Sequence, residues 1–336
     1  MQVKVLAVAL AAVLPLAAFA QSSVTVYGIM DAAIAKEDTG AAGGKRTAIN
    51  SGNQSSSRLG FKGSEDIGGG LKAIFNIEAG VALDTGAADA ALFGRRAVVG
   101  LSGNFGNLTV GREYSPVADV AKETDVFGQG FYGSNLNAFT TGRLTRRLSN
   151  SVNYRSNAMS GFRVGASYAA GETSTGPSQN LMGVMVDYNL AGLYVGAGYH
   201  TIKRQVTGDD KELIFGAGYK MGAFEVKGNY MEADPTGANN KFEQVNLGAA
   251  YTMDAHKFFT NFQTNKLETG AKGNGYAFGY QYSLSKRTNV YASYSTIKNN
   301  AKATFGMNSS STNVTPPATA LGADPKALTL GIRHSF

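Results

Sequence analysis

The sequence has no cysteine, no tryptophan and only three histidines among its 336 residues. Without cysteine, neither a disulfide framework nor a thiolate metal site can form. After Gln21, no apolar stretch approaches the roughly 20 residues that a membrane-spanning helix requires. The rest of the chain is therefore not a helical membrane protein, and nothing in it indicates a cofactor. Any aromatic belt must come from its 16 tyrosines and 18 phenylalanines.

The first twenty residues predict a secretory signal peptide. Lys4 supplies the positive charge, residues 5–14 form a short apolar core, Pro15 ends it, and residues 18–20 (Ala-Phe-Ala) form a small-residue cleavage site. No linker or Pro-rich hinge follows, so we expect residues 21–336 to form a single domain. Loss of Lys4 lowers the formal net charge from +7 to +6.

Residues 328–336 alternate strictly between two faces. One face carries Leu328, Leu330, Ile332, His334 and Phe336 and is apolar, whereas Thr329, Gly331, Arg333 and Ser335 share the polar face. A period of two is that of a β-strand, and an apolar outer face with a polar inner face is typical of a barrel in lipid. We expect this segment to close a barrel by pairing with the strand near residues 24–30.

Seven clusters of Gly, Asn, Asp and Ser predict tight turns along the chain. They lie at residues 66–70, 102–107, 157–161, 189–192, 221–223, 253–256 and 284–287. Seven turns at one rim join strands in pairs, and one further strand remains at each end of the chain. The sequence therefore predicts an all-β fold, a 16-stranded antiparallel transmembrane β-barrel.

A soluble β-sandwich would show the same period of two. Three features favour the barrel: short and long connections alternate, tyrosines cluster near strand ends as in an interfacial girdle, and the signal peptide exports the chain. A barrel of this size has a lumen too wide for wall side chains to fill. Residues 114–144 lack clean alternation, and such a loop of about thirty residues is usually functional. It could fold inward and constrict the pore.

Several short motifs recur in a specific order and spacing. They are residues 24–28 (VTVYG), 57–66 (SRLGFKGSED), 69–75 (GGLKAIF), 92–97 (LFGRRA), 99–101 (VGL), 110–112 (VGR), 150–154 (NSVNY) and 331–336 (GIRHSF). Over essentially the whole mature chain, this order resembles Gram-negative general porins of the β-proteobacterial type.

The resemblance implies a homotrimer of barrels in the cell outer membrane, surrounded by lipid and lipopolysaccharide. It also implies an inward-folded third loop and passive diffusion of small hydrophilic solutes and ions, with no role for nucleic acid. In this family the terminal phenylalanine is read by the barrel-assembly machinery, which suggests that role for Phe336.

In porins of this kind, wall arginines face acidic residues across a constriction. Alternation places Arg58 inward, and it places Arg147 inward if the strand reaches that far. Arg95 and Arg96 are adjacent, so at most one of them should point inward. Residues 97–99 are apolar on both faces, so alternation does not show which one it is. The family pattern favours Arg95. The basic wall predicted from alternation and resemblance is Arg58, Arg95 and Arg147.

The predicted acidic side consists of Asp125, Glu123 and Asp119 from the long loop and Glu78 from a strand. Basic residues outnumber acidic ones at lumen positions, so we expect a mild anion preference, because charge clusters set ion selectivity in pores.

Arg112 shares the outer face with Leu108 and Val110. A lipid-facing arginine near the membrane midplane costs about 2–4 kcal/mol, so we expect Arg112 at the trimer contact. The resemblance suggests an acidic partner from a neighbouring second loop, Asp84 or Asp89.

Alternatives to a general porin remain open. A solute-specific channel has the same sequence pattern, and an adhesin or structural barrel would have a plugged lumen. An outer-membrane hydrolase needs a nucleophile beside a histidine base. His256 sits in a turn, His334 lies on the outer face, and only His200 could face the lumen. The sequence therefore predicts a protein that is not an enzyme.

Overall fold

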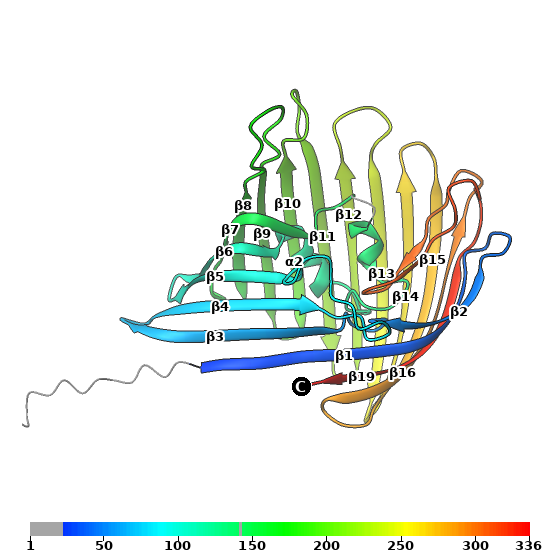
Figure 1. The fold of residues 1–336 in the computed structure, drawn as a ribbon, viewed down its shortest axis with the longest axis horizontal. Coiled ribbons are helices and arrows are strands. Elements are labelled where there is room, and N and C mark those ends of the chain that lie inside the picture. The colour runs from blue at the N-terminus through cyan, green and yellow to red at the C-terminus, as the bar shows by residue number, and fades with distance from the viewer. Residues whose placement is uncertain (1–22, 141–142) are drawn as a thin grey trace, which may run out of the picture.

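Tight turns and alternating side chains produce one antiparallel ring of strands in the described part of the chain (Figure 1). The computed structural model describes residues 23–140 and 143–336, so the signal peptide predicted at residues 1–20 lies outside the described residues. The strands of the ring are β1 (Ser23–Asp38), β2 (Lys45–Ser51), β3 (Arg58–Gly68), β4 (Leu71–Gly80), β5 (Arg96–Gly103), β6 (Gly106–Tyr114), β7 (Arg147–Arg155), β8 (Phe162–Ala169), β9 (Leu181–Leu190), β10 (Leu193–Ile202), β11 (Asp210–Met221), β12 (Phe224–Asp234), β13 (Phe242–Met253), β14 (His256–Leu267), β15 (Lys272–Ser283), β16 (Thr288–Asn299) and β19 (Lys326–Ser335). A separate hairpin, β17 (Met307–Asn308) with β18 (Asn313–Val314), lies in the last long loop.

Strands β2 and β3 share a single position in the ring. Residues 23–29 of β1 pair with β3, and residues 32–38 pair with β2. The described strands therefore fill sixteen positions, and the predicted 16-stranded antiparallel barrel is confirmed.

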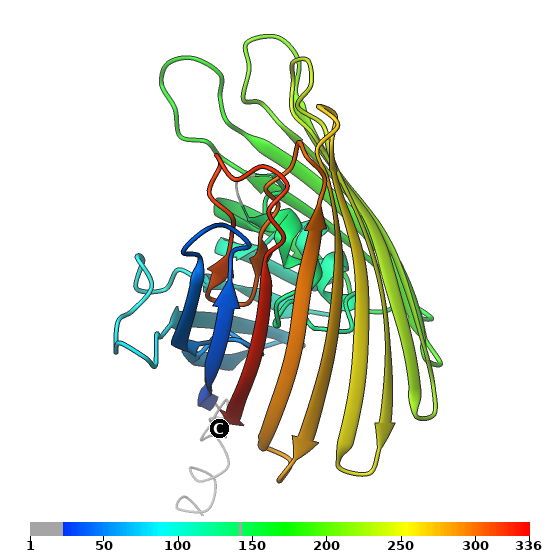
Figure 2. The same cartoon turned by 90° about the vertical axis from the view of Figure 1, so that its right-hand side faces the viewer.

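All seven predicted tight turns join neighbouring strands in the described residues. Residues in them adopt the left-handed backbone conformation that such turns need, as at Ala191 (φ 52°) with Gly192 (φ 86°) and at Asp254 (φ 51°). The short turns lie at one end of the barrel and the long loops at the other (Figure 2).

The first and last strands close the ring. β19 pairs with β1 from Ile29 opposite Ser335 to Asp38 opposite Lys326, and Gly28 and Phe336 exchange two backbone hydrogen bonds of 3.1 Å. The predicted partner strand of residues 328–336 is therefore correct, although the pairing lies further along β1 than expected. Closure removes the free sheet edges, which cannot exist in hydrocarbon.

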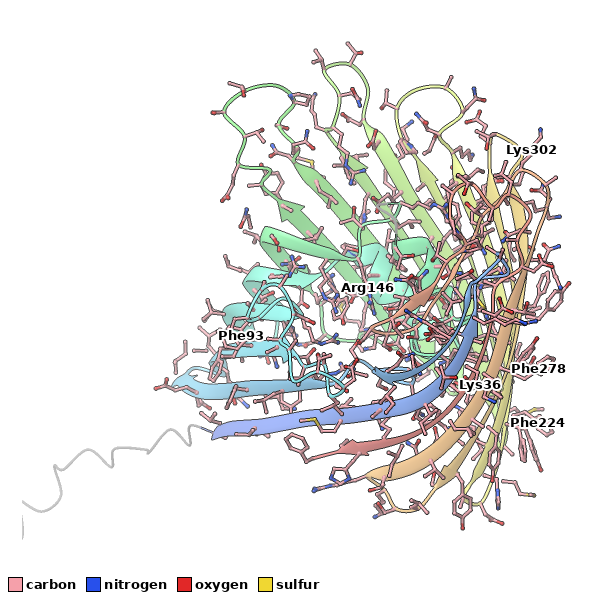
Figure 3. The ribbon with its side chains drawn as sticks, turned by 45° about the vertical axis from the view of Figure 1, so that its right-hand side comes forward. Lys36, Phe93, Arg146, Phe224, Phe278 and Lys302 are labelled. Atoms are coloured by element: carbon pink, nitrogen blue, oxygen red, sulfur yellow. The ribbon has the colours of Figure 1, made fainter. Side chains whose placement is uncertain are left out.

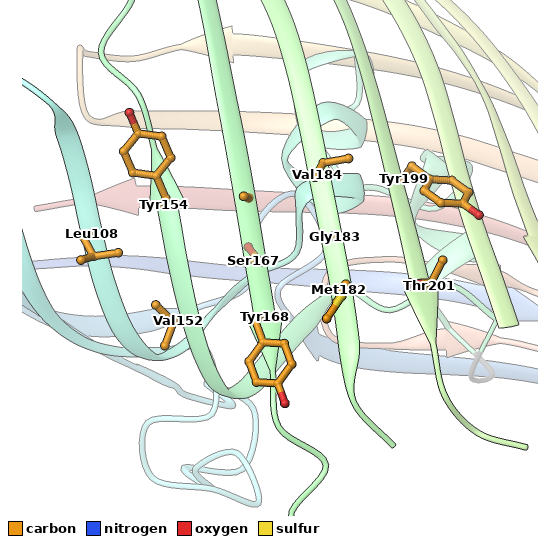
Figure 4. A pocket seen from close by; sticks show the side chains of 11 residues that line it. Leu108, Val152, Tyr154, Ser167, Tyr168, Met182, Gly183, Val184, Tyr199 and Thr201 are labelled. Atoms are coloured by element: carbon orange, nitrogen blue, oxygen red, sulfur yellow. The ribbon is translucent and has the colours of Figure 1, made fainter. Parts of the chain in front are cut away.

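The outer face of the barrel is apolar, as the alternation predicts. Leu330 is 59% exposed, whereas its neighbour Thr329 is 1% exposed. Phe224 and Phe278 project outward from the wall, while Arg146 lies inside it (Figure 3). On β6 to β10 the outward side chains line a shallow apolar depression walled by tyrosines (Figure 4).

Aromatic pairs stand next to the short turns on this outer face. Their ring centroids lie 4.8 Å apart for Phe162 and Tyr188 and 4.6 Å apart for Phe224 and Tyr251. This arrangement fits an aromatic girdle at one membrane interface. No helix among the described residues is long and apolar enough to cross a membrane.

Asp31 fixes the interruption between β2 and β3. Its buried carboxylate accepts hydrogen bonds from the backbone N–H groups of Asn53 (3.2 Å), Gln54 (3.1 Å) and Ser55 (2.8 Å), and from the Tyr291 hydroxyl (2.7 Å). The segment 52–57 is thereby held on the inner side of the wall. Arg58, the first residue of β3, follows it directly.

The connection between β6 and β7, residues 115–146, is hereafter the constriction loop. It contains helix α2 (Pro116–Glu123) and the short 3₁₀ helix η1 (Asn135–Phe139). Helix α2 contacts the inner face of β8 to β11, and η1 contacts β13 and β17. The predicted inward fold of the third long loop is therefore confirmed, and Figure 1 shows α2 enclosed by the strands.

Candidate functional site

Helix α2 begins where the sequence supplies a cap. The Ser115 hydroxyl accepts a hydrogen bond from the Ala118 N–H (3.1 Å), and Pro116 at the first helical position has no N–H to satisfy. Val117 and Val120 are fully buried against the wall. The opposite face of the helix points into the lumen and carries the charged residues Asp119, Lys122 and Glu123.

Aromatic contacts hold the tip of the constriction loop to the opposite wall. The Phe127 ring lies 5.0 Å from that of Phe259 in β14, and the Phe131 ring lies 5.1 Å from that of Tyr291 in β16. The Asn261 side chain also donates a 2.6 Å hydrogen bond to the carbonyl of Gly133. The described part of the loop is thus packed against the wall both at α2 and at its tip, which gives its lumen-facing charges fixed positions.

A basic cluster lies across from α2. It contains the predicted residues Arg58, Arg95 and Arg147, together with Arg146, and its arginines lie close enough for their charges to interact. The Arg147 guanidinium stacks 4.6 Å from the centroid of the Tyr114 ring and donates a 2.8 Å hydrogen bond to its hydroxyl.

Arg146 was not identified from the sequence. It precedes β7 in a segment without alternation, so no pattern assigned it a face. Its guanidinium donates to the Gln129 amide oxygen (3.1 Å). Burial lowers its pKa to about 10, so it keeps its charge at neutral pH.

Glu78 belongs to the basic wall, and its predicted place on the acidic side is wrong. Its carboxylate lies 2.6 Å from Arg95 Nε and 3.7 Å from Arg58 Nη1, and it accepts a hydrogen bond from the Tyr27 hydroxyl (3.0 Å). The physical reason is adjacency: β3 and β4 are neighbours, and Glu78 is opposite Gly60 in the ladder. The carboxylate partly neutralises the arginines around it.

Arg95 and Arg96 both reach the inner side of the barrel. Val98 is 6% exposed and Val99 is 62% exposed, so Arg96 shares the inner face with Val98. Arg95 precedes the strand and is free of its alternation, so it turns inward to Glu78. The expectation that at most one points inward is wrong.

Arg58, Arg96 and Tyr114 line a cavity of about 620 Å³ that the face of α2 also borders. Arg95 is buried behind Glu78 and does not line this cavity. Arg96 in turn pairs with Glu113, a lumen carboxylate that the sequence analysis did not single out although it lies at inner parity.

Asp119 and Glu123 lie where the sequence predicts, on the loop and at the same cavity as Arg58. Asp119 pairs with Arg155 on β7 at 2.7 Å, which neutralises much of its charge. The Glu123 side chain is 40% exposed, and its nearest cation is Lys122 at 3.9 Å. Glu123 is therefore the freer of the two carboxylates.

Asp125 is buried inside the constriction loop and does not line the pore as predicted. It is 2% exposed, and it accepts hydrogen bonds from the backbone N–H groups of Phe127 (3.0 Å), Gln129 (2.9 Å) and Asn135 (3.2 Å). Burial raises the pKa of the Asp125 carboxyl, and these N–H groups oppose that rise. Sequence cannot distinguish an acidic residue that shapes a loop from one that faces the lumen.

Arg112 lies on the outer face, as its parity predicts. It is opposite Ala97 in the ladder, and its guanidinium donates to the Gly94 carbonyl and the Ser149 hydroxyl, both at 2.6 Å. Asp84 and Asp89 lie on the second long loop, residues 81–95, which stands away from the wall in Figure 2. Both are exposed.

The three histidines have different surroundings. His256 contacts the Tyr280 hydroxyl (2.8 Å) and His334 the Thr288 hydroxyl (2.9 Å), near the short turns. His200 is fully buried, and its Nε2 accepts a hydrogen bond from the backbone N–H of Val117. That nitrogen is therefore not available to deprotonate a serine.

These features define a class of protein: a membrane channel whose polar lumen is narrowed by an inward-folded loop with charged side chains on both sides. The sequence matches the family described as Gram-negative porin over residues 7–302. The chain belongs to that family. It is an outer-membrane porin through which small hydrophilic solutes and ions diffuse passively, and it is not an enzyme.

Individual relatives agree with this assignment along the whole chain. Outer membrane porin protein 32 of Delftia acidovorans is 31% identical over 95% of this chain and 96% of its own length. An outer membrane porin of Bordetella pertussis is 28% identical over the full length of both chains. Among solved structures, an anion-selective porin from Comamonas acidovorans is similar with a TM-score of 0.84 and 29% identity, over 94% of this chain and 100% of that one.

The different surroundings of Asp125 and Glu123 predict different effects of removing each carboxylate. Asp125→Ala leaves three backbone N–H groups without an acceptor, at a cost of about 1–3 kcal/mol each, so we expect a looser loop and a noisier open-channel current. Glu123→Ala removes an exposed charge and should shift ion selectivity toward anions without added noise. Single-channel recording in planar bilayers measures both quantities. A change of selectivity without noise in Asp125→Ala would contradict the buried role.

Proposed function

We propose that this porin prefers anions. The argument rests on the basic cluster, in which the guanidinium groups of Arg58, Arg95, Arg146 and Arg147 lie close enough to interact with one another. One carboxylate, that of Glu78, pairs with two of them, Arg58 and Arg95. Charge of one sign at a constriction favours counter-ions, since it lowers their electrostatic energy in the lumen.

Most other charges at the cavity are compensated, which supports a mild rather than a strong preference. Arg96 pairs with Glu113, Arg155 with Asp119, and Arg163 with Asp187. Such pairs have little net charge and add little to the field in the lumen. The uncompensated positive charge therefore lies in the basic cluster, and the partly exposed Glu123 on α2 is the negative charge that opposes it. The anion-selective porin among the solved structures is consistent with the same sign.

Reconstituted channels test this proposal through the zero-current potential across a salt gradient. We expect anion selectivity in the native protein. We expect a shift toward cations in Arg58→Ala and a comparable one in Arg96→Ala, because each substitution removes one positive charge that lines the cavity. Lys286→Ala, in the exposed turn between β15 and β16, removes a positive charge outside the cluster and should leave the potential unchanged. Cation selectivity of the native channel would refute the proposal.

We further propose a homotrimer with Arg112 at the subunit contact. The side chain lies on the outer face beside the base of the second long loop, which carries the exposed Asp84 and Asp89. An ion pair across a subunit contact avoids the cost of an arginine facing lipid.

Arg112→Ala should lower the temperature at which purified trimers dissociate into folded monomers on electrophoresis, because it removes this contact. Folding of the barrel itself should be unaffected, and heat-modifiable mobility of the monomer measures that separately. Unchanged trimer dissociation would place Arg112 outside the contact.

We also propose that the outer face contacts lipopolysaccharide. Exposed lysines follow the apolar band toward the long loops, where phosphate groups of an anionic lipid would lie. They are Lys211, Lys266, Lys298 and Lys326.

We also propose that Phe336 acts in membrane assembly, through the barrel-assembly machinery. Its ring is 43% exposed and covers Gly28, where an added Cβ would meet the ring at 2.4 Å. Deletion of Phe336 should reduce the amount of assembled trimer in outer membranes far more than it changes the conductance of the channels that do assemble. Normal yield in membrane fractions would count against this role.

A further inference from the structure

A buried junction joins both ends of the constriction loop to the barrel wall. At the start of the loop, the backbone N–H of Val117 donates to His200 Nε2 (3.2 Å). At its end, the backbone N–H and the hydroxyl of Thr145 donate to Glu212, at 2.8 and 2.7 Å. His200 Nδ1 and Glu212 Oε2 lie 3.1 Å apart, on the adjacent strands β10 and β11.

The two ends of the loop are also hydrogen-bonded to each other. The Ser115 N–H donates to the Arg146 carbonyl (3.1 Å), and the Ser115 hydroxyl donates to the Thr145 carbonyl (2.7 Å). His200 and Glu212 are 0% and 1% exposed. The stem of the loop therefore closes on itself and is attached to the wall through this histidine and this glutamate.

The hydrogen-bond partners determine the tautomer of His200. A backbone N–H can only donate, so Nε2 must be the unprotonated acceptor. The ring proton then lies on Nδ1 and points to Glu212 Oε2. Gly183 on β9 provides the space for the ring, because a Cβ there would lie 2.5 Å from His200 Cδ2.

We infer that His200 and Glu212 are positioning residues that fix the constriction loop for permeation, and that protonation of His200 releases the start of α2. An imidazolium carries N–H groups at both nitrogens and cannot accept from Val117. Its charge would also face the positive end of the α2 dipole, which disfavours cations. Acid therefore breaks one of the two attachments of the loop. This inference deepens the channel function proposed above.

The groups that face His200 come from four elements. They are Pro116 and Val117 of α2, Gly183 of β9, Glu212 of β11, and Thr145 at the end of the loop, which is hydrogen-bonded to Glu212. Two charged neighbours in the chain have partners of their own: Asp119 pairs with Arg155, and Arg146 donates to Gln129. Among the hydrogen bonds of the described residues, Glu212 is thus the titratable partner of His200.

Two isosteric variants separate the roles of the ring nitrogens. Gln at position 200 places an amide oxygen near Nε2, so His200→Gln can still accept from Val117 but cannot titrate. Asn places its amide near Nδ1, so His200→Asn can reach Glu212 but not Val117. Each full-length protein is exported, purified and reconstituted in planar bilayers, and closures are counted from neutral pH down to about pH 4.

We expect closures of the native channel to rise with acid, by up to about tenfold per pH unit while the protonated fraction is small. His200→Gln should remain open across the range, and His200→Asn should flicker already at neutral pH. The inference is overturned if the native channel and His200→Gln share one pH profile. It is also overturned if His200→Asn is as quiet as the native channel at neutral pH. If every variant conducts ions, the channel function stands even where the inference about His200 fails. If the native protein itself does not conduct, the channel function is contradicted instead.

Discussion

Closure of the backbone hydrogen-bond ladder between β1 and β19 is the constraint on which the rest of the molecule depends. In hydrocarbon, an unpaired N–H or C=O has no water to satisfy it, so the sheet must meet its own first strand. The pairing from Ile29 to Asp38 achieves this, and Gly28 with Phe336 extends it by one exchange. Once the ring is closed, strand alternation decides which side chains meet lipid and which meet water. The polar lumen is thus a consequence of the apolar exterior.

A ring of this circumference leaves a lumen that the side chains of its wall cannot fill. The constriction loop fills part of this lumen and narrows it. Its attachments are of different kinds: aromatic rings at the tip, a buried carboxylate within the turn, and hydrogen bonds to Glu212 and His200 at the stem. The hydrogen bonds compensate the buried polar groups for the water that they lose, and the aromatic contacts bury apolar surface. One side of the loop therefore belongs to the protein interior, and the other side lines the channel. Helix α2 has both kinds of surface: an apolar face buried against the wall and a charged face at the cavity.

The sequence predicts the wall better than the lumen. Seven turns, sixteen strand positions and the closing partner of residues 328–336 follow from turn chemistry and a period of two, which are local properties. Glu78, Arg95 and Asp125 required information on which strands are neighbours, where a strand begins and how a loop turns. Asp187 and Glu113 sit at inner parity and could have been found by extending the alternation test. Arg146 gave no such signal, because it lies outside any strand.

The stem of the constriction loop has a consequence for how the channel can change over evolution. Ser115 is hydrogen-bonded to the carbonyls of Thr145 and Arg146, and Glu212 binds the same stem. These hydrogen bonds fix the two ends of the loop, whatever the length or composition of the residues between them. Insertions between such fixed ends cost little extra closure entropy, about 0.6 kcal/mol for each doubling of loop length. The barrel can thus serve as a constant frame, and the size and charge of its opening can vary without altering a single wall strand.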